Sequence, residues 1–282
     1  MFLYRRIAII AWLLTILLPL FPQSINAGSR HSTLNVVLLG DSNTWLGGDD
    51  CSNQKGWNTW FVSELQPASC RSYARSGATW TNTPQTKRNT EEDIAVLGDD
   101  NVIYNQICRL TDATYKGGQP LPHLIIIMAG TNDAWFSDKR PQAFCEPLLT
   151  NDSTSCTMSG TYCCGTVSPD RVLTLQESVT YGCRLLRKAY PDAMLVLVTP
   201  PQTTAVETTL INRTGNIIER VGASLAIPVI RLDLEGCIDR EQELKQKRFT
   251  YDGTHTNKDG ARCIGTLIAS KVDELTIRKE DN

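Results

Sequence analysis

One serine of the chain lies in a setting suited to nucleophilic chemistry. In residues 34–45 an apolar run ends on the small polar triplet Gly40, Asp41 and Ser42. A serine hydroxyl becomes an effective nucleophile when a neighbouring base takes its proton, and that base needs an acceptor that fixes its tautomer. The alternative interpretation is a strand that ends in an ordinary turn. A histidine elsewhere in the chain must decide between the two.

Of the three histidines, His255 is the best candidate for this base. It lies in the polar turn YDGTHTN, after the last predicted strand and before the final predicted helix, and Asp252 lies three residues upstream. At that spacing the carboxylate can accept a hydrogen bond from the imidazole within one turn. His31 precedes the first predicted strand and His123 begins a buried one, so we interpret both as structural.

Two further motifs could stabilise the oxyanion that forms when an ester is attacked. MAGTND ends the central predicted strand, where Gly130 permits a tight turn and the Asn132 amide can project over the rim. In ARSGATW, Gly77 lets the backbone approach a ligand closely and direct its N–H toward it. Taken singly, these residues would be interpreted as a turn asparagine and a turn glycine.

The order of apolar and amphipathic segments predicts the fold that must hold these residues. Apolar runs of strand length occur at residues 34–39, 123–130, 194–200 and 228–234, with a shorter strand at 70–76. Segments with helical features separate or follow them, at residues 57–65, 91–115, 171–190, 206–225 and 258–275. We therefore expect one α/β domain with three α/β/α layers and a mainly parallel sheet of about five strands. Functional groups in such sheets gather outside the carboxyl ends of the strands, where Ser42 falls.

The first residues predict export. Arg5 and Arg6 precede an apolar stretch at 7–21, and the small residue Ala27 closes the segment. We interpret residues 1–27 as a cleaved signal peptide, since the apolar stretch is short for a membrane span, with an uncleaved anchor as the alternative. The mature domain, 28–282, would then be secreted or periplasmic, with no stable membrane insertion after cleavage.

Ten cysteines follow the predicted signal, an even number that suits disulfides in an oxidising compartment. No C-x-x-C pair occurs, which disfavours a zinc site. Within residues 139–168, an irregular segment rich in Ser, Thr and Pro holds Cys145, Cys156, Cys163 and Cys164. We interpret this cysteine-rich insertion as a disulfide-stapled flap or a surface excursion. The net charge of -2 gives no sign of a nucleic-acid partner.

Together, these motifs resemble the hallmarks of the SGNH hydrolases, also called GDSL-type esterases and lipases, in order and in position at strand ends. The resemblance covers essentially the whole mature chain and implies a flavodoxin-like sheet. It implies that Ser42 is the nucleophile and the first oxyanion donor through its own N–H, that Gly77 is the second donor, and that Asn132 is the third. His255 would be the general base and Asp252 its orienting acid. No metal or organic cofactor is expected in this scheme.

The sequence departs from the family's common pattern at two positions. Asn43 stands where Leu is common, and Thr256 follows the histidine where Pro is frequent. Neither position carries a proton or an oxyanion, so the departures concern substrate preference more than catalysis. Asp41 could be a second acid, but an aspartate beside the nucleophile more often braces the turn.

Three tryptophans share one offset from the site residues. Trp45, Trp80 and Trp135 each lie three residues after Ser42, Gly77 or Asn132. They could pack the loops against the sheet or line a cleft for sugar rings and acyl groups. We predict a secreted deacylase acting on a small-molecule or glycan ester, with acetyl as the expected acyl group. The alternatives are a lipase or lysophospholipase with the insertion as its lid, an acyltransferase, and a non-catalytic glycan-binding protein. The sequence does not indicate an oligomeric state.

Overall fold

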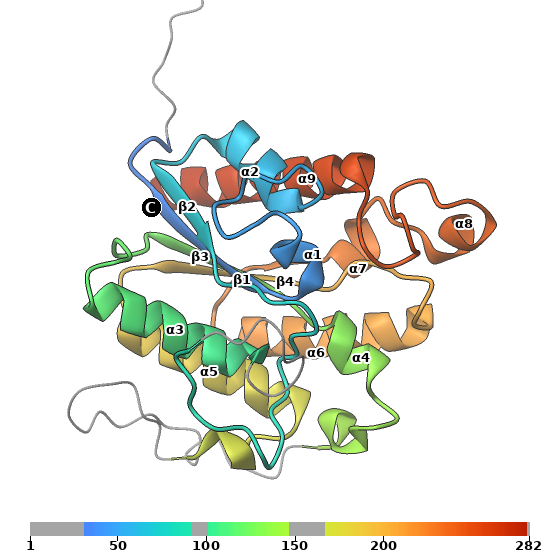
Figure 1. Ribbon diagram of the computed structural model, residues 1–282, viewed down its shortest axis with the longest axis horizontal. Coiled ribbons are helices and arrows are strands. Elements are labelled where there is room, and N and C mark those ends of the chain that lie inside the picture. The colour runs from blue at the N-terminus through green and yellow to red at the C-terminus, as the bar shows by residue number, and fades with distance from the viewer. Residues whose placement is uncertain (1–30, 92–100, 147–166, 281–282) are drawn as a thin grey trace, which may run out of the picture. The chain divides into compact units, whose positions relative to one another are not determined.

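Five strands lie side by side in one parallel sheet (Figure 1), in the order β2-β1-β3-β4-β5. The computed structural model describes residues 31–91, 101–146 and 167–280. The strands are β1 (Asn35–Gly40), β2 (Ser69–Ser72), β3 (Leu124–Met128), β4 (Met194–Val198) and β5 (Val229–Ile230). All four pairings between neighbouring strands are parallel, which confirms the predicted α/β sheet.

The central strands are buried on both faces, which explains their uninterrupted aliphatic sequences. Successive side chains of β1 point to opposite faces, so Val37 and Leu39 join one hydrophobic core while Val36 and Leu38 join the other. The strand order reverses direction between β1 and β3, because the chain leaves β1 for β2 on one side and later returns to β3 on the other. Ligands of such sheets bind at this reversal, outside the carboxyl ends of the strands.

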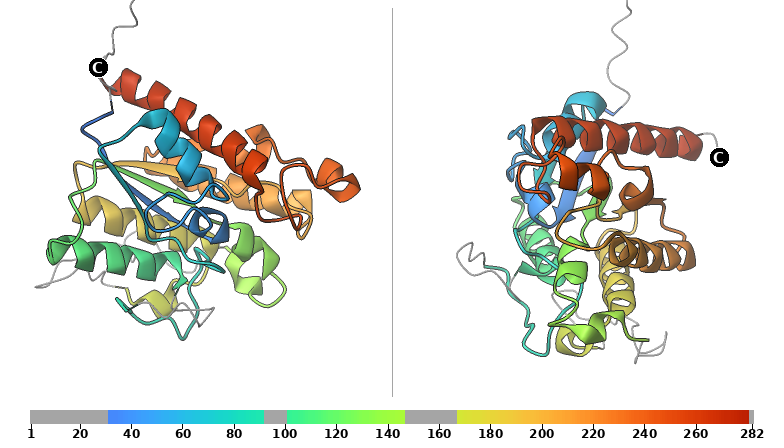
Figure 2. Two further views of the ribbon diagram at one scale, coloured as in Figure 1. Left: turned by 45° about the horizontal axis from the view of Figure 1, so that its top comes forward. Right: turned by 90° about the vertical axis from the view of Figure 1, so that its right-hand side faces the viewer.

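Helices cover both faces of the sheet and complete the three layers (Figures 1 and 2). One face packs against α2 (Trp57–Leu65) and α9 (Lys258–Glu280), and the other against α3 (Ile103–Tyr115), α5 (Leu175–Ala189) and α6 (Thr208–Ser224). The shorter elements are α1 (Ser42–Trp45), α4 (Thr131–Trp135), α7 (Leu232–Glu235), α8 (Arg240–Lys245) and the 3-10 turns η2 (Pro141–Phe144) and η3 (Pro169–Arg171).

Several predicted element boundaries were wrong for local reasons. Helix α5 begins at Leu175 instead of residue 171, because Thr174 and Glu177 form a reciprocal capping box that starts the helix there. Strand β2 ends at Ser72, where the predicted strand continued to Ser76. Beyond it the backbone N–H of Arg75 bonds across to the end of β1.

The predicted last strand is also much shorter than expected, because β5 gives way to α7. The buried carboxylate of Asp233 accepts hydrogen bonds from the Thr199 hydroxyl at 2.6 Å and from Nε of Arg231 at 2.8 Å. These polar contacts draw the chain into a helical turn instead of a continued strand. Helix α9 runs to Glu280, five residues beyond its predicted end.

The described residues contain seven of the ten cysteines. Cys237 and Cys263 form a disulfide, whereas Cys51, Cys70, Cys145 and Cys183 are thiols. The predicted signal peptide lies outside the described residues, as does most of the cysteine-rich insertion, including Cys156, Cys163 and Cys164. Across the described ranges, no helix combines the length and apolar character that crossing a membrane requires.

Candidate active site

Ser42 begins a short helix at the carboxyl end of β1. The Asp41 carboxylate caps this helix by accepting the N–H of Asn43 at 3.1 Å, so the chain turns into α1 directly after the strand. Gly40 is needed at the turn, since a Cβ there would lie 2.5 Å from the carbonyl oxygen of Met128. Ser42 is therefore held beside the end of β3, at the reversal of strand order.

His255 reaches Ser42 from a loop 213 residues further along the chain. Its Nε2 lies 2.9 Å from the Ser42 Oγ, and its Nδ1 lies 2.6 Å from Oδ2 of Asp252. The other carboxylate oxygen of Asp252 accepts the backbone N–H groups of Thr254 at 2.9 Å and of His255 at 2.7 Å. One carboxylate thus holds both the loop and the imidazole, and such a series of hydrogen bonds permits the imidazole to accept the serine proton.

The pKa values of the two carboxyl groups near Ser42, those of Asp252 and Asp41, are shifted in opposite directions. Partial burial acts to raise the pKa of Asp252, but hydrogen bonds from His255 and Thr254 outweigh it and hold that pKa below its ordinary value. Asp41 is fully buried, and this burial raises its pKa from 3.8 to about 6 against the opposing hydrogen bond from Asn43. Asp252 therefore stays ionised to a lower pH than an ordinary aspartate, whereas Asp41 stays protonated to a higher pH than an ordinary aspartate.

The loop that contains Gly77 lies between the segments that contain Ser42 and Asn132. The N–H of Arg75 donates to the Gly40 carbonyl at 3.1 Å, which places the loop beside the end of β1. Gly77 itself has a φ of 75°, a left-handed conformation that favours glycine. The Asn132 Nδ2 donates to the Ala78 carbonyl at 2.9 Å, and the second hydrogen of this amide is left for another acceptor.

Sequence reasoning missed Asp133, which joins two of these segments. Its buried carboxylate accepts the backbone N–H groups of Trp80 and Thr81, both at 2.9 Å, and the Thr81 hydroxyl at 2.8 Å. Burial raises the pKa of Asp133, although the hydrogen bonds from Thr81 and Trp80 oppose the change. Its position next to Asn132 at a strand end was the only signal in the sequence.

The tryptophans with the shared offset have different surroundings. Trp45 and Trp135 are 37% and 45% exposed, on the helices that begin with or contain Ser42 and Asn132. Trp80 is only 2% exposed and lies in the hydrophobic core that α5 covers, so it cannot line a cleft. A fourth aromatic residue, Tyr251, was not predicted. It is 54% exposed and stacks on His255 with a 5.7 Å separation of ring centroids.

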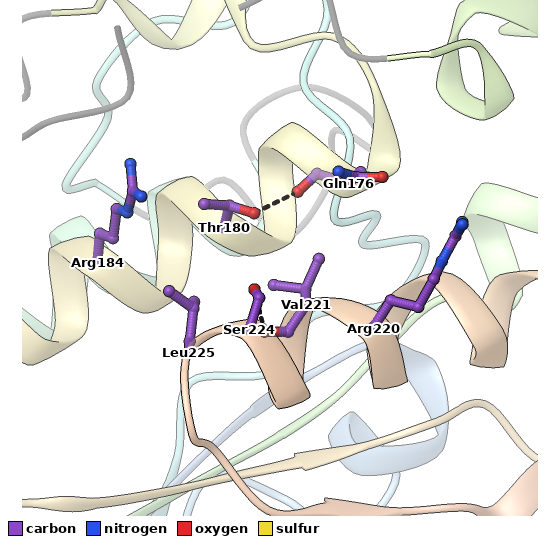
Figure 3. A pocket seen from close by; sticks show the side chains of 7 residues that line it. All are labelled: Gln176, Thr180, Arg184, Arg220, Val221, Ser224 and Leu225. Carbon is purple, nitrogen blue, oxygen red and sulfur yellow. Dashed lines mark hydrogen bonds between the residues drawn. The ribbon is translucent and has the colours of Figure 1, made fainter. Parts of the chain in front are cut away.

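A groove of about 340 Å³ lies elsewhere, between α5 and α6 (Figure 3). Its lining includes Thr180, Arg184 and Arg220, and none of the predicted site residues. Among the described residues, no group of three or more His, Cys, Asp or Glu side chains could hold a metal ion.

Residues 38–263 match the model of the GDSL-like Lipase/Acylhydrolase family. The chain belongs to this family. Membership implies ester hydrolase activity, and the match includes every residue of the Ser42, Gly77, Asn132, Asp252 and His255 set. Among curated proteins, none matches this GDSL-like hydrolase in sequence.

Solved structures share the fold of this GDSL-like hydrolase. A possible lipase from Chitinophaga pinensis is 17% identical, with a TM-score of 0.53 over 86% of this chain and 99% of that one. A proposed GDSL-like lipase from Bacteroides ovatus is 17% identical, with a TM-score of 0.52 over 88% and 99%. A proposed arylesterase from Agrobacterium tumefaciens is 18% identical, with a TM-score of 0.51 over 86% and 99%. At these identities the likeness shows the fold alone.

Proposed function

We propose that the protein is a secreted serine hydrolase that removes short acyl groups, acetyl above all, from carbohydrate or small-molecule esters. The observation that carries the proposal is the series of hydrogen bonds from Asp252 through His255 to Ser42, with separations of 2.6 and 2.9 Å. This is the arrangement that activates a serine hydroxyl as a nucleophile.

In the first half of the reaction, the Ser42 Oγ attacks the ester carbonyl carbon while its proton passes to Nε2 of His255. The electron pair of the C=O bond moves to oxygen and forms a tetrahedral oxyanion. When this intermediate collapses, the C–O bond to the alcohol breaks and the leaving oxygen takes the proton from His255. The acyl group stays on Ser42, and Asp252 stabilises the imidazolium while it exists.

Three N–H groups are proposed to face the oxyanion. Ser42 is the first residue of α1, and the N–H at this position of a helix has no intrahelical acceptor. Gly77 and Asn132 would supply the backbone N–H and the side-chain N–H of the other two donors. The Asn132 contact with Ala78 supports this assignment, because it joins the Gly77 loop to α4.

In the second half, water replaces the alcohol. His255 takes a proton from the water as the oxygen attacks the acyl carbon, and it then returns that proton to the Ser42 oxygen as the acid departs. Asp252 remains ionised throughout, which is consistent with a pKa held below its ordinary value by its hydrogen bonds against partial burial.

The exposed aromatic side chains support a substrate with a flat or ring-shaped group. Trp45, Trp135 and Tyr251 lie on the segments that contain Ser42, Asn132 and His255, and all three are exposed. Aromatic faces suit sugar rings and compact acyl groups. Export is supported by the signal-like residues 1–27 and is compatible with the disulfide.

A serine-directed phosphonate probe tests the chemistry. We expect one adduct, located at Ser42 by peptide mass spectrometry, and loss of both adduct and esterase activity in Ser42→Ala and His255→Ala proteins that remain folded. Ser52→Ala is the matched control, because Ser52 is an exposed serine of the next loop. A wild-type protein that reacts at Ser52 or not at all would overturn the proposal.

A series of esters tests the substrate class. We expect turnover of acetyl esters and acetylated polysaccharides to exceed that of long-chain acyl lipids. Trp45→Ala should raise KM for the polysaccharide more than for a small acetyl ester, whereas Tyr115→Ala, at an exposed aromatic residue of α3, should change neither. Cleavage of long-chain lipids without cleavage of acetyl esters would show that the substrate is wrong while the serine chemistry stands.

A further inference from the structure

Asn43, directly after the proposed nucleophile, contacts the backbone on both sides of His255. Its Oδ1 accepts the N–H of Thr256 at 3.3 Å, and its Nδ2 donates to the carbonyl of Thr254 at 3.3 Å. Asn43 is only 1% exposed, so water does not compete for these groups. A single carboxamide therefore joins α1 to the loop that contains the histidine.

The orientation of this carboxamide follows from its partners. Its oxygen faces an N–H group and its nitrogen faces a carbonyl, so a flipped amide would place like groups against each other. The backbone of Asn43 is also held, since its N–H donates to the Asp41 carboxylate at 3.1 Å. The contact thus fixes the position of the His255 loop relative to α1 and does not merely fill space.

Asp252 and Asn43 constrain different movements of the imidazole. Asp252 is in the same loop as His255, so its hydrogen bonds orient the ring within that loop but do not determine how far the loop lies from Ser42. Asn43 spans this gap. Thr256 adds a second anchor, because its buried hydroxyl donates to the Lys55 carbonyl at 2.8 Å.

Asn43 and Thr256 are chemically matched across this contact. A leucine at position 43 could not accept the Thr256 N–H, and a proline at position 256 would have no N–H to donate. Each residue supplies the partner that the other needs. This complementarity is visible only in the folded chain, since the residues are 213 positions apart.

We propose that Asn43 and Thr256 are a coupled pair of positioning residues that hold the His255 imidazole within hydrogen-bonding distance of Ser42. The inference rests on the proposed function, in which these two groups exchange a proton. Removing either member leaves a buried polar group unpaired, so the loop shifts to satisfy it, and the distance from imidazole to hydroxyl changes.

A double-mutant cycle tests the coupling, with Asn43→Leu, Thr256→Pro and the double variant. The measured quantities are the second-order rate of phosphonate labelling at Ser42, and kcat and KM for an acetyl ester. We expect each single variant to lose about tenfold in labelling rate and in kcat with little change in KM. The double variant should lose no more than the worse single variant, which is far from the product of the two losses.

Two controls separate positioning from general destabilisation. Thr256→Val keeps the backbone N–H but loses the hydroxyl contact with Lys55, so it should lose less than Thr256→Pro. Asn105→Leu removes another fully buried asparagine, whose Oδ1 accepts the N–H of Asn89 at 2.9 Å. It should lower the thermal unfolding temperature without changing the labelling rate. If Asn43→Leu does not fold, Asn43→Ala takes its place in the cycle.

The outcomes distinguish this inference from the proposed function. If the wild-type protein labels at Ser42 but the losses of the two single variants multiply in the double variant, the coupling is wrong and the hydrolase proposal stands. A labelling rate and kcat of Asn43→Leu equal to those of the wild type would also show that the coupling is wrong, while the hydrolase proposal stands. If the wild-type protein neither labels at Ser42 nor cleaves esters, both fail together.

Discussion

Replacement of Asp133 should separate the support of the Gly77 loop from the chemistry at Ser42. The buried carboxylate accepts three hydrogen bonds, from the Trp80 N–H, the Thr81 N–H and the Thr81 hydroxyl, at 2.8 to 2.9 Å. Asp133→Ala leaves all three donors without this acceptor. Asp133→Asn keeps one oxygen for Thr81 but turns an NH₂ group toward the Trp80 N–H.

The size of the effect follows from the number of unpaired donors. A buried donor that loses its partner costs about 1–3 kcal/mol. Three such donors would cost more than this, but removing a carboxylate whose burial raises its pKa returns part of the free energy. We therefore expect Asp133→Ala to lower the free energy of unfolding by about 3 kcal/mol, and Asp133→Asn by about half as much.

Urea denaturation at neutral pH measures this loss, and phosphonate labelling of Ser42 measures its consequence for the site. A loosened Gly77 loop should slow labelling in both variants while the protein stays folded at low urea. An Asp133→Ala protein that unfolds at the wild-type urea concentration and labels at the wild-type rate would refute the reasoning.

Three further predictions concern other residues. Asn132→Ala should lower kcat by about 10²-fold, as expected for the loss of one oxyanion donor, and a rate within about twofold of wild type would contradict that role. Because burial raises the pKa of Asp41 to about 6, its contribution to stability is present below the ordinary 3.8 and is lost as the pH rises toward 6. Asp41→Asn can still cap α1 but has no carboxyl group to ionise. The free energy of unfolding of this variant, relative to that of the wild type, should therefore rise by about 3 kcal/mol between about pH 4 and 7. If the difference between the two free energies of unfolding is the same at both pH values, the prediction is wrong. The Sγ atoms of Cys51 and Cys70 lie 3.4 Å apart, so oxidised glutathione should join them by thiol–disulfide exchange, and a peptide map after oxidation without that cross-link would be the contrary result.

The types of the site residues could be predicted from the sequence. Each lies at a local signal, such as a strand that ends on Ser42 or a turn that contains Gly77, and these signals depend only on neighbours in the chain. The sheet was predictable for the same reason, since burial on both faces requires an uninterrupted aliphatic run. The tryptophans show the limit of such local signals. All three lie three residues after a site residue, yet two of their rings are exposed and the third, that of Trp80, is buried.

What the sequence determined by itself was therefore local: which segments are buried, and which polar residues follow strand ends. Only the tertiary structure decided which distant residues form hydrogen-bonded pairs. Asn43 meets Thr256, and Asp133 meets Thr81, only because the order and register of the strands bring distant loops together at one edge of the sheet. Hydrophobic periodicity is a property of near neighbours, whereas a hydrogen bond between loops depends on the positions of both backbones, which no local pattern encodes.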